Sequence, residues 1–254
     1  MTHSIHLDIF IRTVTVRVIA CCALASVVHP FTKLLLNDQA LSQEPATTVA
    51  SPFKVDSTFD GETIDSWHGF KRHKFTFDGA EAWVVEPETP RADGRFSWCM
   101  MFPDAFTQRC AAPMLVSRGY YHVFLSVGNS FGAPQAIEKL DAFHQMLVRR
   151  GFHPQPVLIG ISRGGLYAHR YAATHPDRVS VIYNDAPVLD YQSWPGGKGK
   201  GKGSQGDWQE LKRWYGFNSD QQAAEYPQTP LKEPTRTGIA RRRISTEALL
   251  CNQT

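Results

Sequence analysis

The stretch of sequence that decides the fold is Pro156-Val157-Leu158-Ile159-Gly160-Ile161-Ser162-Arg163-Gly164-Gly165. Its apolar first half is typical of a buried strand, and the pattern of residues 166–173 that follows is helical. Between them lies Gly-x-Ser-x-Gly, the sequence of a sharp strand-to-helix turn that exposes a serine hydroxyl above a sheet. Glycine is expected at 160 and 164 because Cβ atoms would collide there, and Gly165 would let the helix pack close to the strand. We therefore expect Ser162 to lie in a strained conformation at the positive end of a helix.

Strand and helix patterns alternate on both sides of this stretch. Upstream, a hairpin signal at Asp78-Gly79 separates two short strand patterns, and Pro134 opens a helix with apolar residues every three or four positions. The expected strands cover 74–77, 82–86, 98–102, 121–127, 157–161 and 179–183, and the expected helices cover 111–118, 134–150, 164–174, 205–215 and 219–226. This alternation predicts an α/β fold, with a mostly parallel sheet covered by helices on both faces.

Length and composition fit one globular domain. A chain of 254 residues can bury one large core, and its net charge of +3 gives no reason to expect a nucleic-acid partner. We expect a signal peptide or N-terminal anchor over 1–28, a linker over 29–66, a core over 67–231 and an aberrant or disordered tail over 232–254.

The N-terminal segment is typical of an export signal. Arg12 and Arg17 precede an uncharged run from Val18 to Val28, which contains the small-residue pattern Ala23-Leu24-Ala25 that signal peptidases prefer. The run is shorter than the roughly 20 apolar residues of a membrane span. We expect a secreted or periplasmic protein. An uncleaved membrane anchor and a wrongly chosen start codon are the alternatives.

The predicted core resembles the α/β-hydrolase superfamily from about Trp67 to Leu231. The resemblance rests on the order of a hairpin, strand, helix, strand, helix, serine turn, helix and strand. A branch of secreted bacterial hydrolases has similar motifs, here Gly69-Phe70-x-Arg72-His73, Asp185-Ala186-Pro187 and Ser193-Trp194-Pro195-Gly196-Gly197-Lys198-Gly199.

The resemblance implies a serine hydrolase that acts on a carboxylic ester of a small molecule or carbohydrate, with no cofactor and no metal. Ser162 would attack the acyl carbon, and the backbone N–H of Arg163 would stabilise the oxyanion. In the superfamily a second N–H comes from the loop after the third strand of the core. Pro103 has no N–H, so Asp104 or Ala105 is the candidate donor in that loop.

The base and the acid that the superfamily uses are harder to find. Past Ser162 only His169 and His175 remain, and His169 lies roughly 10 Å further along the helix axis. His122 and His153 are expected at the opposite end of the sheet, and His144 in an interior helix, so no histidine is a good base. Asp185 is the one candidate acid. Its other interpretation is a polar residue that shapes the loop before Pro187.

The tail suggests why these residues are missing. After Lys232 the sequence changes character, and it contains no apolar strand, acidic loop or late histidine of the expected kind. One hypothesis is a frameshift or truncation near Lys232, and the alternative is a natural short tail. A serine hydrolase without base and acid would lose about 10³ or more in kcat. The competing function is a non-catalytic chain, either a broken hydrolase or a binding protein.

Residues 196–204 form a Gly/Lys-rich segment, Gly-Gly-Lys-Gly-Lys-Gly-Lys-Gly-Ser. It lacks the Gly-Lys-Ser/Thr ending of a phosphate-binding loop, so we expect a flexible, solvated loop. Because it follows the strand after the serine turn, an alternative is that its lysines lie over the site and favour an anionic substrate.

Overall fold

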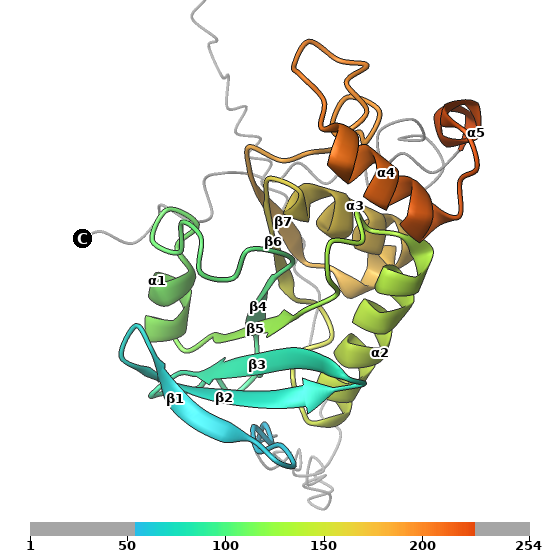
Figure 1. Ribbon diagram of the computed structural model, residues 1–254. Coiled ribbons are helices and arrows are strands. Elements are labelled where there is room, and N and C mark those ends of the chain that lie inside the picture. Colours follow the sequence, from blue (N-terminus) through green and yellow to red (C-terminus); the bar gives the residue numbers. More distant parts are fainter. Residues whose placement is uncertain (1–53, 227–254) are drawn as a thin grey trace, which may run out of the picture. The chain divides into compact units, whose positions relative to one another are not determined.

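The computed structural model describes residues 54–226, which contain one mixed sheet of seven strands flanked by helices (Figure 1). The predicted signal peptide or anchor (1–28), the first part of the linker (29–53) and the predicted tail (232–254) lie outside the described residues. In the described part of the chain, no helix is long and apolar enough to cross a membrane.

The sheet has the strand order β1-β2-β3-β5-β4-β6-β7. Strands β1, β2 and β3 form an antiparallel meander, and β3 also runs antiparallel to β5. Strands β5, β4, β6 and β7 run parallel to one another. The bounds are Thr63–Trp67 for β1, Phe70–Phe77 for β2, Ala80–Glu86 for β3, Phe96–Cys99 for β4, Tyr121–Leu125 for β5, Val157–Ile161 for β6 and Val181–Asp185 for β7. The α/β fold class is confirmed, with its parallel strands in the half of the sheet that holds the serine turn.

The helices lie within a few residues of their predicted positions. They are α1 (Ala112–Ser117), α2 (Pro134–Arg149), α3 (Gly164–Thr174), α4 (Gln205–Tyr215) and α5 (Asp220–Glu225), with a short 3₁₀ turn at Pro176–Arg178. Proline begins α2, where its fixed φ suits the first turn and no N–H is needed. Ser204 and Ser219 cap α4 and α5 by accepting backbone N–H groups of the first turn.

The hairpin between β2 and β3 forms at the predicted turn. Asp78 and Gly79 both have positive φ, 46° and 72°, as a two-residue turn of this hand requires. Lys139 of α2 donates a hydrogen bond to the backbone oxygen of Asp78, which anchors the turn to the helix layer.

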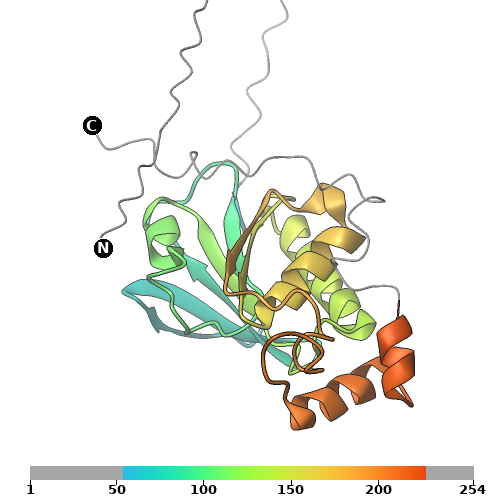
Figure 2. The same cartoon turned by 90° about the horizontal axis from the view of Figure 1, so that it is seen from above.

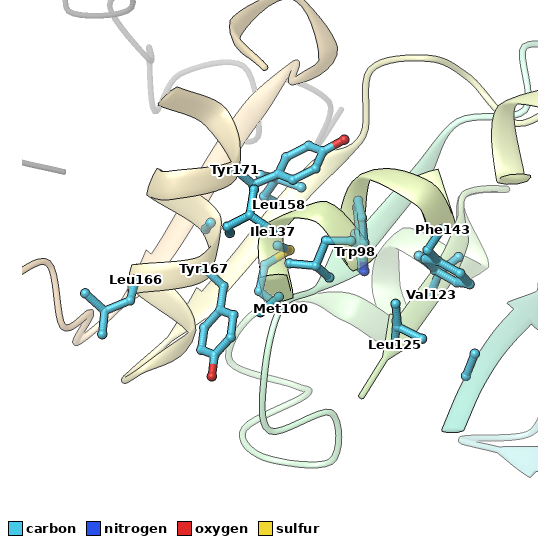
Figure 3. Close-up of a cluster of buried hydrophobic side chains, with 14 of the residues drawn as sticks. Trp98, Met100, Val123, Leu125, Ile137, Phe143, Leu158, Leu166, Tyr167 and Tyr171 are labelled. Atoms are coloured by element: carbon cyan, nitrogen blue, oxygen red, sulfur yellow. The ribbon is translucent and has the colours of Figure 1, made fainter. Parts of the chain in front are cut away.

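Two hydrophobic cores lie on opposite faces of the sheet, with α2 and α3 over one face and α1 over the other (Figure 2). Alternation along each strand divides the side chains between them: Trp98 faces α2 and α3, and its neighbour Cys99 faces α1. Trp98 lies 5.7 Å from Phe143 of α2 and 5.4 Å from Tyr171 of α3, measured between ring centroids. Figure 3 shows these three side chains gathered in the larger core.

The predicted boundary between linker and core at residue 67 is wrong for the described part of the linker. Residues 63–67 form β1, which pairs along its whole length with β2. Before it, Val55 and Phe59 are buried, and Phe59 stacks on Phe75 with ring centroids 3.8 Å apart. The sequence predicts a linker there because the segment is rich in polar residues and low in periodicity, and the burial of single residues leaves no periodic pattern.

Candidate active site

Ser162 lies in the sharp turn between β6 and α3, as the motif predicts. Its φ is 49°, in the left-handed region that is unfavourable for a residue with a side chain. The backbone holds it there: Ser162 N–H donates to the oxygen of Asp185 at 2.9 Å, and Val188 N–H donates to the oxygen of Ser162 at 2.8 Å. The serine side chain is exposed at the carboxyl edge of the parallel strands, where sites of α/β sheets form.

Two of the three glycines in the turn are required by close contacts. A Cβ at Gly160 would lie 2.9 Å from the side-chain oxygen of Asn184, and a Cβ at Gly165 would lie 2.6 Å from Cβ of Pro187. A Cβ at Gly164, in contrast, would meet Met101 at 3.5 Å, an ordinary van der Waals distance. The expectation that Gly164 avoids a collision is therefore wrong, because the neighbouring chain leaves room on that side of the helix.

Four of the eight non-glycine residues with positive φ in the described chain follow the parallel strands one by one. Each of the four parallel strands is followed by a non-glycine residue with positive φ: Phe102 after β4 (59°), Phe131 after β5 (52°), Ser162 after β6 and Ala186 after β7 (44°). Such conformations cost about 1–3 kcal/mol each and persist where the surroundings impose them. Their position at one edge of the sheet marks that edge as the functional one.

The backbone N–H of Arg163 is available as an oxyanion donor. It is the residue before the first turn of α3, and no acceptor for its N–H occurs among the described residues. The loop after β4 comes close to it at Met101, whose backbone nitrogen lies 3.6 Å from the Cβ position of Gly164.

Asp104 is exposed, and in the described part of the chain no contact joins it to the turn. The N–H of Ala105 already donates to the oxygen of Phe102 at 3.0 Å. The structure thus brings Met101 close to the serine turn and makes it a further candidate for the second donor. Met101 was missed because the superfamily comparison directs attention to the loop beyond Pro103.

The candidate acid Asp185 ends β7, beside the serine turn. Its carboxylate accepts a hydrogen bond from Nε of Arg109 at 2.5 Å and also forms an ion pair with it. No histidine contacts Asp185 among residues 54–226. Asp185 thus holds the loop before α1 through its carboxylate and the serine turn through its backbone oxygen.

The histidines after Ser162 are bound elsewhere. Nε2 of His169 lies 3.0 Å from the side-chain nitrogen of Asn184 on β7, and burial lowers the pKa of His169. His175 lies 3.6 Å from Asp141, and burial lowers its pKa as well. As predicted, neither ring contacts Ser162 in the described structure.

The remaining candidate histidines are also unsuitable as a base. His122 is buried at the start of β5, with Nδ1 2.8 Å from Oγ of Ser97, and burial lowers its pKa to about 3. His144 lies inside α2 against the hydroxyl of Tyr171, and burial lowers its pKa to about 4. His153, between α2 and β6, accepts the N–H of Gln155.

The Gly/Lys-rich segment is a compact loop. A Cβ at Gly203 would lie 2.5 Å from the oxygen of Pro195, and Lys198 N–H donates to the oxygen of Gln192 at 2.8 Å. Lys198, Lys200 and Lys202 are exposed, as predicted. Glycine is needed here for tight packing of the chain against itself.

The side chain of Arg163 makes the contacts that sequence reasoning missed. Its Nη1 donates to Oδ1 of Asn129 at 2.6 Å and to Oδ1 of Asp207 at 3.0 Å. Its Cζ lies over three rings, at 5.2 Å from Phe102, 5.8 Å from Phe131 and 5.5 Å from Trp194. These partners come from four separate segments, so only the fold brings them together.

The arrangement around Ser162 offers an exposed hydroxyl and, at Arg163, a backbone N–H that has no acceptor among the described residues. Among the described residues, no group of three or more His, Cys, Asp or Glu side chains could hold a metal ion.

Comparison with known proteins gives only distant similarity. No family model matches the sequence, and no curated protein matches it. Solved structures that are similar include a cold-adapted esterase from an Arctic intertidal metagenomic library, with 15% identity, a TM-score of 0.39 and coverage of 50% of this chain and 64% of the other. An S-formylglutathione hydrolase from Agrobacterium tumefaciens has 13% identity, a TM-score of 0.40 and coverage of 59% and 71%.

A thioesterase domain from the curacin biosynthetic pathway is similar with 14% identity and a TM-score of 0.37, over 50% of this chain and 48% of that domain. The chain spans 64% of the length of the Arctic esterase and 42% of that of Cfl2 from Burkholderia cenocepacia. The fold class follows from the strand order of this chain and the turn at Ser162. The described residues have an α/β fold, in which a seven-stranded sheet with a parallel half is covered by helices.

Proposed function

We propose that this protein is a serine hydrolase that cleaves a carboxylic ester of a small molecule or carbohydrate. The observation that carries the proposal is the geometry of Ser162: an exposed hydroxyl, a φ of 49°, and a turn fixed from both sides by Asp185 and Val188. Such a strained position at the start of a helix is maintained against a cost in stability, as at functional sites.

In the proposed reaction, Oγ of Ser162 attacks the acyl carbon, and the C–O bond to the leaving alcohol breaks. Water then attacks the acyl-serine, releases the acid and returns the hydroxyl. The N–H groups of Arg163 and Met101 would donate to the oxyanion, and the dipole of α3 would add to its stabilisation. The serine proton ends on the leaving alcohol, and in the second step a proton of the attacking water returns to Ser162; none of the candidate histidines discussed above is placed to carry these protons.

A second candidate function is a non-catalytic binding protein that retains the pocket of a hydrolase. The observation in its favour is that, among residues 54–226, no histidine contacts Ser162, while the one neighbouring carboxylate is bound to Arg109. On this hypothesis, Ser162 would be a strained but unactivated hydroxyl.

A fluorophosphonate probe separates the two candidates, because it reacts covalently only with an activated serine. We expect an adduct on the peptide that contains Ser162, and no adduct in the Ser162→Ala variant. Absence of any adduct in the unmodified chain would reject the hydrolase and favour the binding protein. Export from the cytoplasm, or retention by an uncleaved N-terminal anchor, stays a prediction from the sequence of residues 1–28.

A further inference from the structure

The guanidinium of Arg163 joins the serine turn to four other segments. Phe102 lies after β4, Phe131 after β5 and Trp194 after β7, and all three rings face its Cζ at 5.2–5.8 Å. Two of these rings belong to residues with positive φ, Phe102 at 59° and Phe131 at 52°. The fourth segment is α4, reached through Asp207; Figure 1 shows α4 beside α3. The loops that contain Phe102 and Phe131 thus have strained backbone conformations that place their rings around the guanidinium of Arg163.

Asp207 is itself held in place on α4. Its Oδ2 accepts a hydrogen bond from the hydroxyl of Ser204 at 2.6 Å, and its Oδ1 accepts one from Nδ2 of Asn129 at 3.2 Å. The bond from Ser204, followed by those from Asn129 and the charge of Arg163, keeps the pKa of Asp207 below its usual value. Asn129 also donates to Glu210, one turn further along α4. Asp207 is therefore charged at neutral pH and has a fixed orientation.

This ion pair is better shielded than the pair between Arg150 and Asp56. The side chains of Arg163 and Asp207 are 21% and 26% exposed, compared with 27% and 56% for Arg150 and Asp56. Aromatic rings around a guanidinium add about 0.5–2 kcal/mol by cation–π attraction. Because it is shielded from water, we expect the Arg163–Asp207 pair to stabilise the contact between the serine turn and α4, whereas an exposed pair contributes little.

Arg163 also carries the proposed oxyanion donor on its own backbone. A displacement of its main chain would move the N–H away from the reacting oxygen, and misplacement by about 1 Å can cost 10²-fold in rate. We propose that Arg163 is a positioning residue. Its side chain binds α4 and packs against the loops after β4, β5 and β7, and these contacts hold its backbone N–H in the position of the oxyanion donor. The inference deepens the proposed hydrolase function and rests on it.

The test compares Arg163→Met and Asp207→Asn with the full chain and with Arg150→Met. Arg150 is the matched control, because it too pairs with an aspartate, at 2.6 Å from Asp56, and lies over an aromatic ring, at 4.8 Å from Phe59. It is remote from Ser162 in the fold, since it ends α2 at the opposite edge of the sheet.

Two readouts are measured on each protein. We expect amide hydrogen exchange in peptides covering 162–168 and 204–215 to become about tenfold faster in both test variants and to stay unchanged in the control. We expect the rate of fluorophosphonate labelling, and kcat on an activated ester, to fall about tenfold, with KM changed less than twofold. A general loss of folding would instead accelerate exchange in β3 and β5 as well, which the control peptides report.

The outcomes separate this inference from the proposed function. Unchanged exchange at the turn and at α4 in both test variants would overturn the positioning role, whether or not Ser162 reacts. Faster exchange with an unchanged labelling rate would overturn it too, because the position of the Arg163 N–H would then not depend on the side-chain contacts of Arg163. Absence of labelling in the unmodified chain rejects the hydrolase, and with it the catalytic part of the inference.

Discussion

Replacing Gly165 by alanine should destabilise the protein, whereas the same change at Gly164 should not. Both residues lie in the first turn of α3 with helical backbone, so neither change carries a penalty for φ. A Cβ at Gly165 would lie 2.6 Å from Cβ of Pro187 and 2.8 Å from the oxygen of Val188, both in the segment after β7. A Cβ at Gly164 would find its closest neighbour at 3.5 Å, on Met101.

The magnitude follows from these distances. To reach an ordinary contact, the segment at Pro187 must move by about 1 Å, and overpacking of this kind costs about 1–3 kcal/mol. The movement would also stretch the 2.8 Å bond from Val188 N–H to the oxygen of Ser162, which adds about 1 kcal/mol. Alanine gains about 1 kcal/mol over glycine in a helix. We expect a net loss of about 1–3 kcal/mol for Gly165→Ala and a gain of up to about 1 kcal/mol for Gly164→Ala.

Urea unfolding followed by tryptophan fluorescence measures both changes, with the m-value checked for constancy. At this chain size, 1 kcal/mol corresponds to roughly 2–4 °C in Tm, so the two variants should be separated clearly. Equal stability of the two variants, or a more stable Gly165→Ala, would refute the reasoning that the turn is closed against Pro187.

Three further predictions test the core and the site. Burial lowers the pKa of His122 to about 3, so below its ordinary pKa of 6.5 the unfolded chain binds a proton that the native chain does not. The free energy of unfolding should therefore have its full value above pH 6.5 and fall by about 1.4 kcal/mol per pH unit as the pH decreases towards 3. Urea midpoints between pH 7 and 4 should fall less steeply for His122→Asn, and parallel profiles would contradict this origin. Asp185→Asn should change the labelling rate of Ser162 by less than about tenfold, because the carboxylate binds Arg109; a loss near 10⁴, as for a triad acid, would show that Asp185 is the acid after all. Trp98→Ala should lower the free energy of unfolding by about 3–5 kcal/mol, measured as a shift in urea midpoint, because the ring is fully buried between α2 and α3; a loss below 1 kcal/mol would contradict its place in the core.

The elements near the serine could be predicted because their local signals agree with the tertiary structure. Residues 157–161 are a continuous apolar run, and 121–125 are apolar apart from His122, as expected for strands buried on both faces. Asp78 and Gly79 are the residue types that a two-residue hairpin turn requires. The start of the folded region could not be predicted in the same way. The sequence of β1 has one buried residue, Trp67, and its strand conformation depends on pairing with β2.

The serine turn could be predicted for a related reason. Gly160, Ser162 and Gly165 belong to one tight turn, and the residue types that such a turn requires are close together in the sequence. The roles of Asp185 and Asp104 could not be settled from the sequence, since each depends on which side chain faces it across a loop. Arg109, the partner of Asp185, is 76 positions away along the chain.

The sequence by itself determined the α/β class, the order of most elements and the position of the exposed serine, because periodicity and turn chemistry are local properties. Only the tertiary structure decided which side chains surround that serine. Asn129 and Asp207 lie 34 and 44 positions from Arg163 and meet it because parallel strands carry the loops that follow them to the same edge of the sheet. Contacts between such loops depend on distances across the fold, which no local pattern encodes.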